Sequence, residues 1–277
     1  KRLVLLDAHA IIHRAYHALP DFSSSKGEPT GALYGLITML LKIIEDLKPD
    51  YISACFDLPD PTHRHIAYEG YKATRAKTED ALVSQLIRSR AVFKAFGILT
   101  YEAKGFEADD ILGTVAKGLK KRSDIEIVIA SGDLDTLQLV DGKRVKVYTL
   151  RKGLNDTVIY DENGVEERYG FGPERIPDYK GLSGDASDNI KGITGIGEKT
   201  ATNLILQFGS VEEIYKTLKK NPEEFEKRGI TPRVVKMLSE GEKDAVFSKM
   251  LATISTDAPV FYEVPEKTWS VEENLQN

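Results

Sequence analysis

The fold is decided by the stretch Ile125-Glu126-Ile127-Val128-Ile129-Ala130-Ser131-Gly132-Asp133, in which a short, β-rich apolar run leads to an acidic residue. Two similar runs lie earlier in the chain, Leu3 to Leu6 before Asp7 and Ile52 to Phe56 before Asp57. Short apolar runs without clean alternation are typical of strands buried on both faces of a parallel sheet. We therefore expect three strands of one sheet, each followed by an aspartate.

Helical periodicity separates these runs, with apolar residues repeating at intervals of three to four. The predicted helices cover Gly31 to Leu47, Thr78 to Phe96 and Glu107 to Lys121. Alternating strands and helices predict an α/β fold, with a central and mostly parallel sheet flanked by helices. Because ligands bind at the carboxyl ends of the strands in such sheets, the three aspartates are expected to form one spatial cluster.

The second half of the chain has a different pattern. After about Asp161 the strand signals fade, and Glu174 to Leu251 is typical of short helices broken by Gly and Pro. We predict two domains, an α/β core over residues 1–170 and a helical region over residues 171–277.

The composition is that of an ordinary globular protein, with 29% charged and 41% hydrophobic residues among 277. The single cysteine, Cys55, cannot close an internal disulfide, and no apolar stretch approaches the roughly 20 residues that span a bilayer. Without a recognisable leader, these features predict a cytoplasmic protein with no membrane partner. The net charge of −5 argues weakly against a nucleic-acid partner, but it changes sign when the acidic residues described next are set aside.

Nine carboxylates stand out because they follow predicted strands or lie in short acidic segments. They are Asp7, Asp57, Glu107, Asp109, Asp110, Asp133, Asp135, Asp185 and Asp188. Taken singly, each segment has a structural interpretation that is the more common one: a turn, the acidic first turn of a helix, or a capping pair. Taken together, converging carboxylates would repel one another unless cations held them ionised.

The group therefore predicts a metal site. All-oxygen ligands favour hard ions such as Mg²⁺ or Mn²⁺, and two such ions about 4 Å apart can activate a water and stabilise a leaving oxygen in phosphoryl hydrolysis. We find no convincing serine or cysteine triad, and this chemistry needs none. On an ideal helix Glu107 and Asp109 point about 200° apart, so Glu107 is expected to precede the helix or to act indirectly.

Three segments carry a resemblance to a known family. Gly105 to Asp110, Ala130 to Asp135 and Gly181 to Asn189 are similar to the metal-binding motifs of the 5′-nuclease domain of bacterial DNA polymerase I, within the flap endonuclease superfamily. The similarity runs in order through nearly the whole chain. It implies a PIN-like 5′-nuclease fold, with a helical arch at about 62–96 in the core and a helix-three-turn-helix at about 184–209.

The resemblance also implies a function. The chain would be a structure-specific 5′-3′ exonuclease and flap endonuclease that uses two metal ions on DNA in replication and repair. The expected partners are DNA with a 5′ flap or 5′ end and, in a longer chain, a polymerase domain; the expected state is a monomer near the bacterial nucleoid. Three alternatives remain: a DNA-binding module without catalysis, an RNA-cleaving relative, and a phosphatase with Asp133 as its nucleophile.

The segment Tyr68 to Lys77 interleaves cations and aromatics, which suits phosphate contact and base stacking on a single strand. On composition alone, a solvated loop is an equally good interpretation. By the resemblance, Lys72 and Arg75 would stabilise charge on the scissile phosphate. Tyr71 would stack on a base.

Two further features of the resemblance concern the DNA path. Arg14 follows the first aspartate, as in the family, and is expected to contact DNA. The arch departs from the family pattern, because prolines usually follow the arginine whereas this chain has Lys77 and Glu79. We therefore expect an arch that is more helical or differently ordered.

A second DNA-binding motif is expected in Gly192-Ile193-Thr194-Gly195-Ile196-Gly197-Glu198-Lys199-Thr200-Ala201, which opens a helix. Glycines let backbone amides approach a phosphate, and a helix N-terminus adds positive potential. A nucleotide P-loop is the rival interpretation; it fails because Glu198 interrupts the required Gly-Lys-Ser/Thr sequence and no strand precedes the loop. By the resemblance, the loop grips the duplex backbone, often with a bound K⁺. The residues expected to contact DNA are Gly192, Gly195, Gly197, Lys199 and Thr200.

His9, His13 and His17 recur every four residues and could line one helix face as zinc ligands. Because that helix offers no cysteine and no acidic partner, packing or DNA contact is the preferred interpretation.

Overall fold

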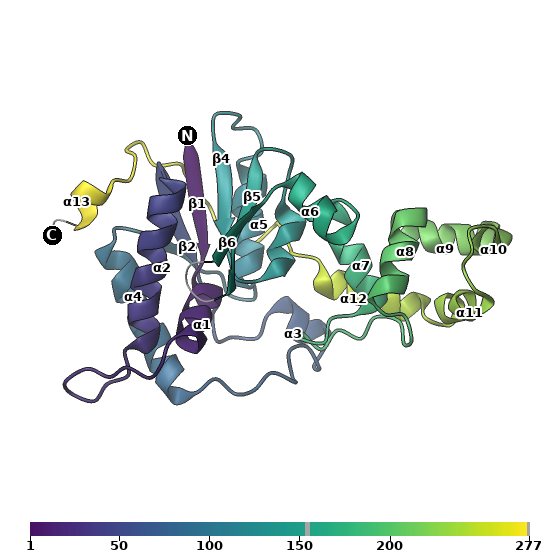
Figure 1. Ribbon diagram of the computed structural model, residues 1–277, viewed down its shortest axis with the longest axis horizontal. Coiled ribbons are helices and arrows are strands. Elements are labelled where there is room, and N and C mark those ends of the chain that lie inside the picture. Colours follow the sequence, from purple (N-terminus) through teal and green to yellow (C-terminus); the bar gives the residue numbers. More distant parts are fainter. Residues whose placement is uncertain (153–155, 276–277) are drawn as a thin grey trace. The chain divides into compact units, whose positions relative to one another are not determined.

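The computed structural model describes residues 1–152 and 156–275 (Figure 1). Contacts divide the chain into two compact units. The first unit contains Lys1–Thr62, Lys77–Asp161 and Ser255–Asn277, and the second contains His63–Ala76 and Glu162–Ile254. Each unit is therefore assembled from segments that lie far apart in the sequence.

The first unit is built on a six-stranded sheet with the strand order β3-β2-β1-β4-β5-β6 (Figure 1). The strands are β1 (Arg2–Asp7), β2 (Tyr51–Cys55), β3 (Leu99–Tyr101), β4 (Glu126–Ala130), β5 (Val145–Lys152) and β6 (Asp156–Tyr160). Neighbouring strands are parallel except β5 and β6, which are antiparallel. The predicted α/β fold with a mostly parallel sheet is confirmed, and the three predicted strands are β1, β2 and β4.

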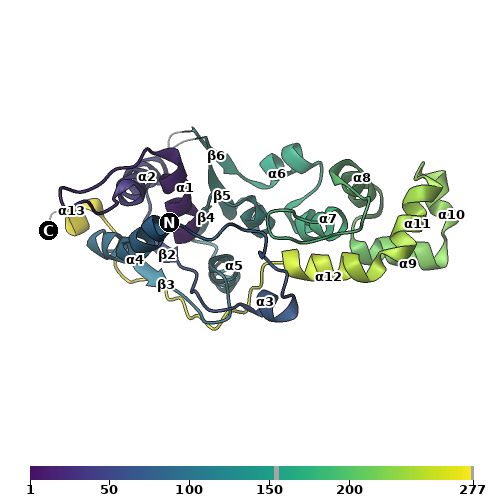
Figure 2. The ribbon, with the colours of Figure 1, turned by 90° about the horizontal axis from the view of Figure 1, so that it is seen from below.

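Helices cover both faces of this sheet. The helices of this unit are α1 (Ala8–Ala18), α2 (Gly31–Leu47), α4 (Asp80–Ala95), α5 (Ala108–Gly118), the 3-10 helix η1 (Leu134–Leu139) and α13 (Val271–Leu275). Figure 2 shows α1 and α2 on one side of the sheet and α5 on the other. Val4 and Leu6 of β1 pack into a core with α1, α2 and α4, and Leu3 and Leu5 are equally buried. Because successive side chains of a strand point to opposite faces, burial on both faces explains the unbroken apolar run.

The segment between α3 and α4 departs from one expectation. α3 (His63–Ala67) is followed by turns and extended backbone over residues 68–79, and α4 begins only at Asp80. Glu79 lies at the start of α4, and its carboxylate accepts a hydrogen bond of 2.7 Å from the Tyr16 hydroxyl. Of the two alternatives expected for this part of the arch, more helical or differently ordered, the first is therefore wrong for residues 68–79.

The second unit is helical, as predicted for this part of the chain. Besides α3 it contains α6 (Glu162–Tyr169), the short 3-10 helix η2 (Pro173–Arg175), α7 (Ile176–Ser183), α8 (Glu198–Phe208), α9 (Val211–Lys220), α10 (Glu223–Lys227), α11 (Pro232–Glu240) and α12 (Glu242–Ala252). Helices α7 and α12 lie against each other at Gly181, where an added Cβ would come within 2.8 Å of Lys249 Cβ. Across the described ranges, no helix is both long and apolar enough to cross a membrane.

Candidate metal centre and nucleic-acid interface

The carboxyl ends of three adjacent strands bring acidic residues together in the first unit. Asp7 is the last residue of β1 and pairs with Cys55, the last residue of β2, so that Asp57 follows two residues beyond. On the other side of β1, Leu6 pairs with Ala130, the last residue of β4, and the chain then leads through Ser131 to Asp133. The predicted cluster at this edge of the sheet is therefore supported by the strand register.

The pKa of Asp7 shows that these carboxylates repel one another electrostatically. Burial raises its pKa, because the side chain is only 4% exposed, and the negative charge of Asp57 raises it further. Hydrogen bonds from the Ala10 amide and the Ser131 hydroxyl act in the opposite direction, Asp133 adds to the rise, and the resulting pKa is about 7. Asp7 thus lies where a second negative charge is unfavourable unless a cation compensates it.

The pKa of the buried Cys55 thiol is affected by the same negative charges. Its pKa is raised well above the usual value, first by burial and then by the charges of Asp7, Asp109 and Asp57. The charges of Asp57 and Asp133 thus act on Asp7, and the charges of Asp7, Asp57 and Asp109 act on Cys55. These four carboxylates therefore lie in one region of the first unit.

Two residues that the sequence interpretation did not assign to the metal centre hold this cluster in place. The hydroxyl of Ser131 donates to Asp7 Oδ2 at 2.7 Å and accepts from the Asp133 amide at 2.9 Å. His9 Nδ1 accepts from the Asp57 amide at 3.1 Å, and its ring packs edge-on against Phe56. Ser131 could have been found from its place two residues before Asp133 in the segment Ala130 to Asp135, and His9 from its place two residues after Asp7.

The beginning of α5 supplies the next acidic residues. Glu107 is the N-cap of this helix and so precedes it, which confirms one of the two expectations for this side chain. Asp57 Oδ1 accepts a 2.7 Å hydrogen bond from the Ala108 amide, which ties the end of β2 to the start of α5. A helix N-terminus favours negative charge, so this position stabilises ionised carboxylates.

The remaining acidic residues of this unit differ in their contacts. Asp109 is half-buried, whereas Asp110 is fully buried and its two oxygens accept from the amides of Glu107 at 3.0 Å and Ser255 at 2.8 Å. Asp133 caps η1 by accepting from the Asp135 amide at 2.9 Å. Among residues 1–152 and 156–275, no three His, Cys, Asp or Glu side chains already form a compact metal-ligand group.

Asp185 and Asp188 belong to the second unit, where cations pair with both. Burial raises the pKa of Asp185, but the charge of Lys180 at 2.5 Å and hydrogen bonds from Ser187 lower it to about 2. Asp188 forms an ion pair with Arg75, lies 3.8 Å from Lys72 Nζ and accepts from the Tyr71 hydroxyl at 3.1 Å. The structure thus places the predicted phosphate-binding cations against a predicted metal ligand.

The backbone supports this pairing. Lys72 has a left-handed conformation, with φ of 55°, and its amide donates to the Asp188 carbonyl at 2.9 Å. Asn189 is also left-handed, and its side chain donates to the Gly70 carbonyl at 2.7 Å. The turn around residues 70–75 is therefore fitted to the loop around residues 185–190.

Tyr71 is placed differently from a surface stacking platform. Its ring is 3% exposed and packs with Ile190, Leu251 and Ala252. Lys72 Nζ lies 4.9 Å from the ring centroid, a cation–π distance. The ring is therefore buried within the second unit and packs against the turn that contains it.

The glycine loop joins α7 to α8 and has the backbone that its sequence predicts. Gly192 and Gly195 have φ of +61° and +89°, a region that favours glycine. The Gly192 amide donates to Ser248 Oγ at 3.0 Å, and a Cβ there would collide with the Gly184 backbone nitrogen. Gly197 is the exposed N-cap of α8, and a Cβ there would meet nothing within 4 Å.

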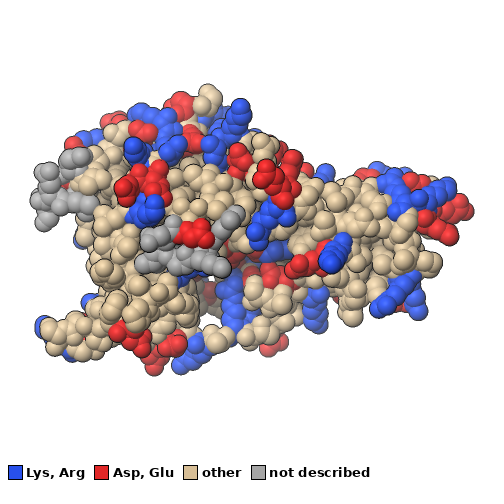
Figure 3. Space-filling view, viewed as in Figure 1, with Lys and Arg blue, Asp and Glu red and all other residues tan. Residues whose placement is uncertain are grey.

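Three predicted DNA contacts lie on helices. Lys199 is exposed and Thr200 is half-buried in the first turn of α8. Arg14 is half-buried in α1. On the face seen in Figure 3, basic and acidic side chains intermingle, so this face has no uniform charge that would guide a polyanion by itself.

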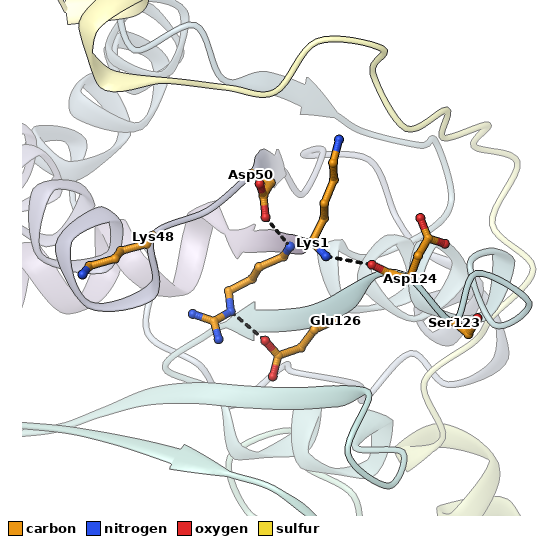
Figure 4. A pocket seen from close by; sticks show the side chains of 7 residues that line it. Lys1, Lys48, Asp50, Ser123, Asp124 and Glu126 are labelled. Carbon is orange, nitrogen blue, oxygen red and sulfur yellow. Dashed lines mark hydrogen bonds and ion pairs between the residues drawn. The ribbon is translucent and has the colours of Figure 1, made fainter.

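The opposite edge of the sheet holds a pocket of a different kind (Figure 4). It has a volume of about 460 Å³ and lies at the amino ends of β1 and β4. Arg2 Nε lies 2.7 Å from Glu126, and the Arg2 amide donates to Asp50 at 2.7 Å. These charges neutralise one another, which makes the carboxyl edge the better candidate for a functional site.

Family comparison agrees with this fold and this edge of the sheet. The N-terminal resolvase-like domain of 5′-3′ exonucleases matches residues 2–170, and the C-terminal SAM fold of 5′-3′ exonucleases matches residues 171–274. The chain therefore belongs to the 5′-3′ exonuclease family.

Individual relatives fall into two groups. The chain is 42% identical over 260 residues to DNA polymerase I of Bacillus subtilis (strain 168), which covers 94% of this chain but 28% of the polymerase. It is 38% identical over 225 residues to a 5′-3′ exonuclease of Aquifex aeolicus (strain VF5), with 81% of this chain and 76% of that protein covered. The chain thus spans less than a third of the polymerase.

A solved structure supports the fold independently of close sequence similarity. The bacteriophage T5 D15 flap endonuclease, in a pseudo-enzyme–product complex with DNA and metal ions, matches with a TM-score of 0.71 at 20% identity. The match covers 92% of this chain and 90% of that chain. The predicted 5′-nuclease fold is confirmed.

Proposed function

We propose that this chain is a divalent-metal-dependent, structure-specific 5′ nuclease that hydrolyses phosphodiester bonds at 5′ ends and 5′ flaps of DNA. The observation that carries the proposal is the convergence of Asp7, Asp57 and Asp133 at the carboxyl ends of three adjacent parallel strands, with the pKa of Asp7 raised to about 7. Membership of the 5′-3′ exonuclease family supports it.

The residues of the first unit fit hard divalent ions. Their donors are carboxylate oxygens, which Mg²⁺ and Mn²⁺ prefer, and their mutual repulsion is the condition that bound cations relieve. We propose that two ions are held by Asp7, Asp57, Glu107, Asp109, Asp133 and Asp135. When bound, such ions lower the pKa of a water and offset charge that develops on the phosphate oxygens.

The protein's own groups keep the ligands in place. Ser131 fixes both Asp7 and the backbone of Asp133, while His9 and the Ala108 amide fix the backbone and side chain of Asp57. Hydrogen-bonded partners of this kind orient metal ligands. The carboxylates are therefore prepared for the ions before substrate arrives.

Lys72 and Arg75 are proposed to stabilise charge on the scissile phosphate. Both cations already face an anion, the carboxylate of Asp188, so the turn is suited to holding negative charge. A DNA phosphate would then compete with Asp188 for them, which would release Asp188 for a metal ion. We propose the same exchange for Asp185, which Lys180 holds now.

We propose that the glycine loop grips the duplex backbone. Gly197 leaves the first amides of α8 open to a phosphate, and Gly192 and Gly195 give the loop its turn, with K⁺ as the proposed ion there. Lys199 and Thr200 extend the contact. Arg14 would add a further contact, and Tyr71 is proposed to reach a base only if the turn opens.

The relatives suggest a wider setting. We propose that the chain acts in DNA replication and repair, in the bacterial cytoplasm near the nucleoid. We also propose that a polymerase domain accompanies it in the natural protein, as the name of the Bacillus relative suggests, and that the chain works as a monomer. We propose residues 1–170 and 171–277 as the sequence ranges of the two domains, with residues 63–76 grouped by contacts with the second unit and residues 255–277 with the first.

A cleavage assay tests the activity. A DNA flap labelled at its 5′ end is incubated with the protein in Mg²⁺ or in chelator, and the products are resolved by length. We expect a short 5′ fragment in Mg²⁺ alone, and none from Asp133→Asn. Flap binding without cutting in any divalent ion would leave a DNA-binding module; preferred cutting of RNA or of a phosphomonoester would favour the corresponding alternative.

A matched pair of lysine variants tests the turn. Lys72→Ala removes a cation beside Asp188, and the loss should reduce cleavage about 10²-fold, as for other groups that stabilise transition-state charge. Lys77→Ala removes a cation five residues further on that forms no hydrogen bond or ion pair within residues 1–152 and 156–275, and it serves as the control. Equal activity of the two variants would contradict the proposed role of Lys72.

A further inference from the structure

The C-terminal segment Ser255–Leu275, called the strap below, returns to the first unit and runs along it. Figure 2 shows this yellow segment passing α5 and β3 on its way to α13. Its Tyr262 ring packs against Tyr101 of β3, and the Trp269 indole donates to the Phe96 carbonyl at 2.8 Å. The strap is therefore held at several points along its length.

The strap begins on one face of α5. Asp110, Thr114 and Lys117 are spaced by four and three residues, so their side chains lie on the same side of the helix. Each contacts the strap: Asp110 Oδ1 accepts from the Ser255 amide at 2.8 Å, Thr114 Oγ1 from the Ala258 amide at 3.0 Å, and Lys117 donates to Thr256 at 3.0 Å. Three polar side chains on one side of α5 thus bind three residues within the strap segment 255–258.

The same contacts reach the acidic start of α5. The second oxygen of Asp110 accepts from the Glu107 amide at 3.0 Å, within the capping box that begins the helix. Asp110 is fully buried, so its carboxylate joins the strap to the backbone that carries Glu107 and Asp109. Thr114 also donates to the Asp110 carbonyl at 2.7 Å and extends this link by one turn.

We infer that Asp110 and Thr114 are positioning residues, through which the strap fixes Glu107 and Asp109 for metal binding. This inference rests on the proposed metal-dependent nuclease. It gives Asp110 a role different from the ligand role that its motif predicts, because both oxygens are engaged by backbone amides in a fully buried position. The strap then belongs to the metal centre although it supplies no ligand.

The test measures Mn²⁺ binding to the whole chain by calorimetry, without DNA, and amide hydrogen exchange at residues 107–110. Thr114→Val removes the hydroxyl that binds the strap and leaves every carboxylate in place. We expect Mn²⁺ affinity to fall about tenfold, as for other groups that orient metal ligands, with unchanged stoichiometry. Exchange at residues 107–110 should become faster.

Two controls separate this role from a general structural effect. Thr114→Ser keeps the hydroxyl and should restore both affinity and exchange. Thr38→Val removes a similar helix hydrogen bond, 2.9 Å to the Tyr34 carbonyl, at a site away from the strap, and should change neither. If Thr114→Val does not fold, Lys117→Met replaces it, with the same direction of change expected.

The outcomes are distinct. Unchanged exchange at residues 107–110, or unchanged Mn²⁺ affinity while exchange at residues 255–258 shows a released strap, would overturn the inference. Failure of the wild-type chain to bind Mn²⁺ would instead count against the proposed function, and the exchange data would still decide whether the strap orders the start of α5.

Discussion

Asp7 gives the first residue-scale prediction, a pH dependence of stability without metal. Its pKa is about 7 in the folded chain and near 3.8 when unfolded, so between these values the folded state holds a proton that the unfolded state has lost. Metal-free protein should therefore lose stability as pH rises from about 4 to about 7, by at most roughly 4 kcal/mol. Urea unfolding in the presence of a chelator, at several pH values, measures this change in the free energy of unfolding.

Asp7→Asn is the control, because it cannot ionise and should show no such loss in that pH range. Asp185 contributes with the opposite sign and in another window: its lowered pKa gives stability above about 4 that is lost as pH falls toward 2. A wild-type stability that stays level between pH 4 and 7, in step with Asp7→Asn, would contradict the raised pKa.

Ser131 carries the second prediction. Ser131→Ala removes both the donor to Asp7 and the acceptor of the Asp133 amide, which leaves buried polar groups unsatisfied and should cost about 1–3 kcal/mol. Mn²⁺ affinity should fall as well. Ser89→Ala is matched, since Ser89 is also buried in this unit but its one hydroxyl bond among the described residues goes to the Leu86 carbonyl within its own helix. Thermal unfolding and calorimetry of both variants measure these effects. Equal Mn²⁺ affinity of Ser131→Ala and Ser89→Ala would contradict the role of Ser131 in holding the metal ligands.

At the scale of the element, two glycines of the α7–α8 loop are expected to behave differently. Gly192→Ala places a side chain at a positive φ and against Gly184, so it should lower stability by about 1–3 kcal/mol and weaken duplex binding. Gly197→Ala meets open space at an ordinary φ, so it should weaken duplex binding with a smaller stability loss. Thermal melts and fluorescence anisotropy with a labelled duplex compare them; unweakened binding by Gly197→Ala would contradict phosphate contact there.

The elements that could be predicted from sequence are those whose pattern is set by local burial. α2 matches the predicted Gly31 to Leu47, because its apolar residues repeat along one buried face. β3 was missed because it has three residues, two of them exposed, and is defined only by pairing with β2. β6 was missed because it is the edge strand, where burial is less continuous. β5 is largely buried, but it was missed because Lys146 and Thr149 interrupt its apolar run.

The residues of the candidate site likewise divide into those that local sequence patterns predict and those that depend on contacts between distant segments. The cluster of Asp7, Asp57 and Asp133 could be predicted because parallel strands end at a common edge. The ion pair of Arg75 with Asp188 could not, since it joins residues 113 apart through the packing of two loops. The burial of Tyr71 was equally hidden, because a tyrosine among cations has the same composition whether its ring faces solvent or a core.

At the scale of the whole molecule, the two units should respond differently to metal. Ions that bind only the folded first unit stabilise it by about 2.7 kcal/mol at a hundred times the dissociation constant. Trp269, the single tryptophan, packs against the core of this unit, so its fluorescence reports the unit's unfolding. We expect Mg²⁺ to raise the midpoint temperature of the unfolding transition that Trp269 reports. The Asp133→Asn substitution should abolish this increase.

Hydrogen exchange extends this measurement to the second unit. Slower exchange in β1 and β4 alone would confine the ions to the first unit. Slower exchange around Asp185 as well would place Asp185 and Asp188 among the ligands. A Trp269 transition that Mg²⁺ leaves unchanged would contradict metal binding by the first unit.

The scattered make-up of the first unit has a consequence for protein synthesis. β1, β2 and β4 leave the ribosome early, but the amide that binds Asp110 belongs to residue 255. Translation proceeds at roughly 5–20 residues per second, so residue 255 is made roughly 7–27 seconds after the last residue of α5. The growing chain therefore completes the backbone support of its acidic centre only after the entire helical unit has been translated.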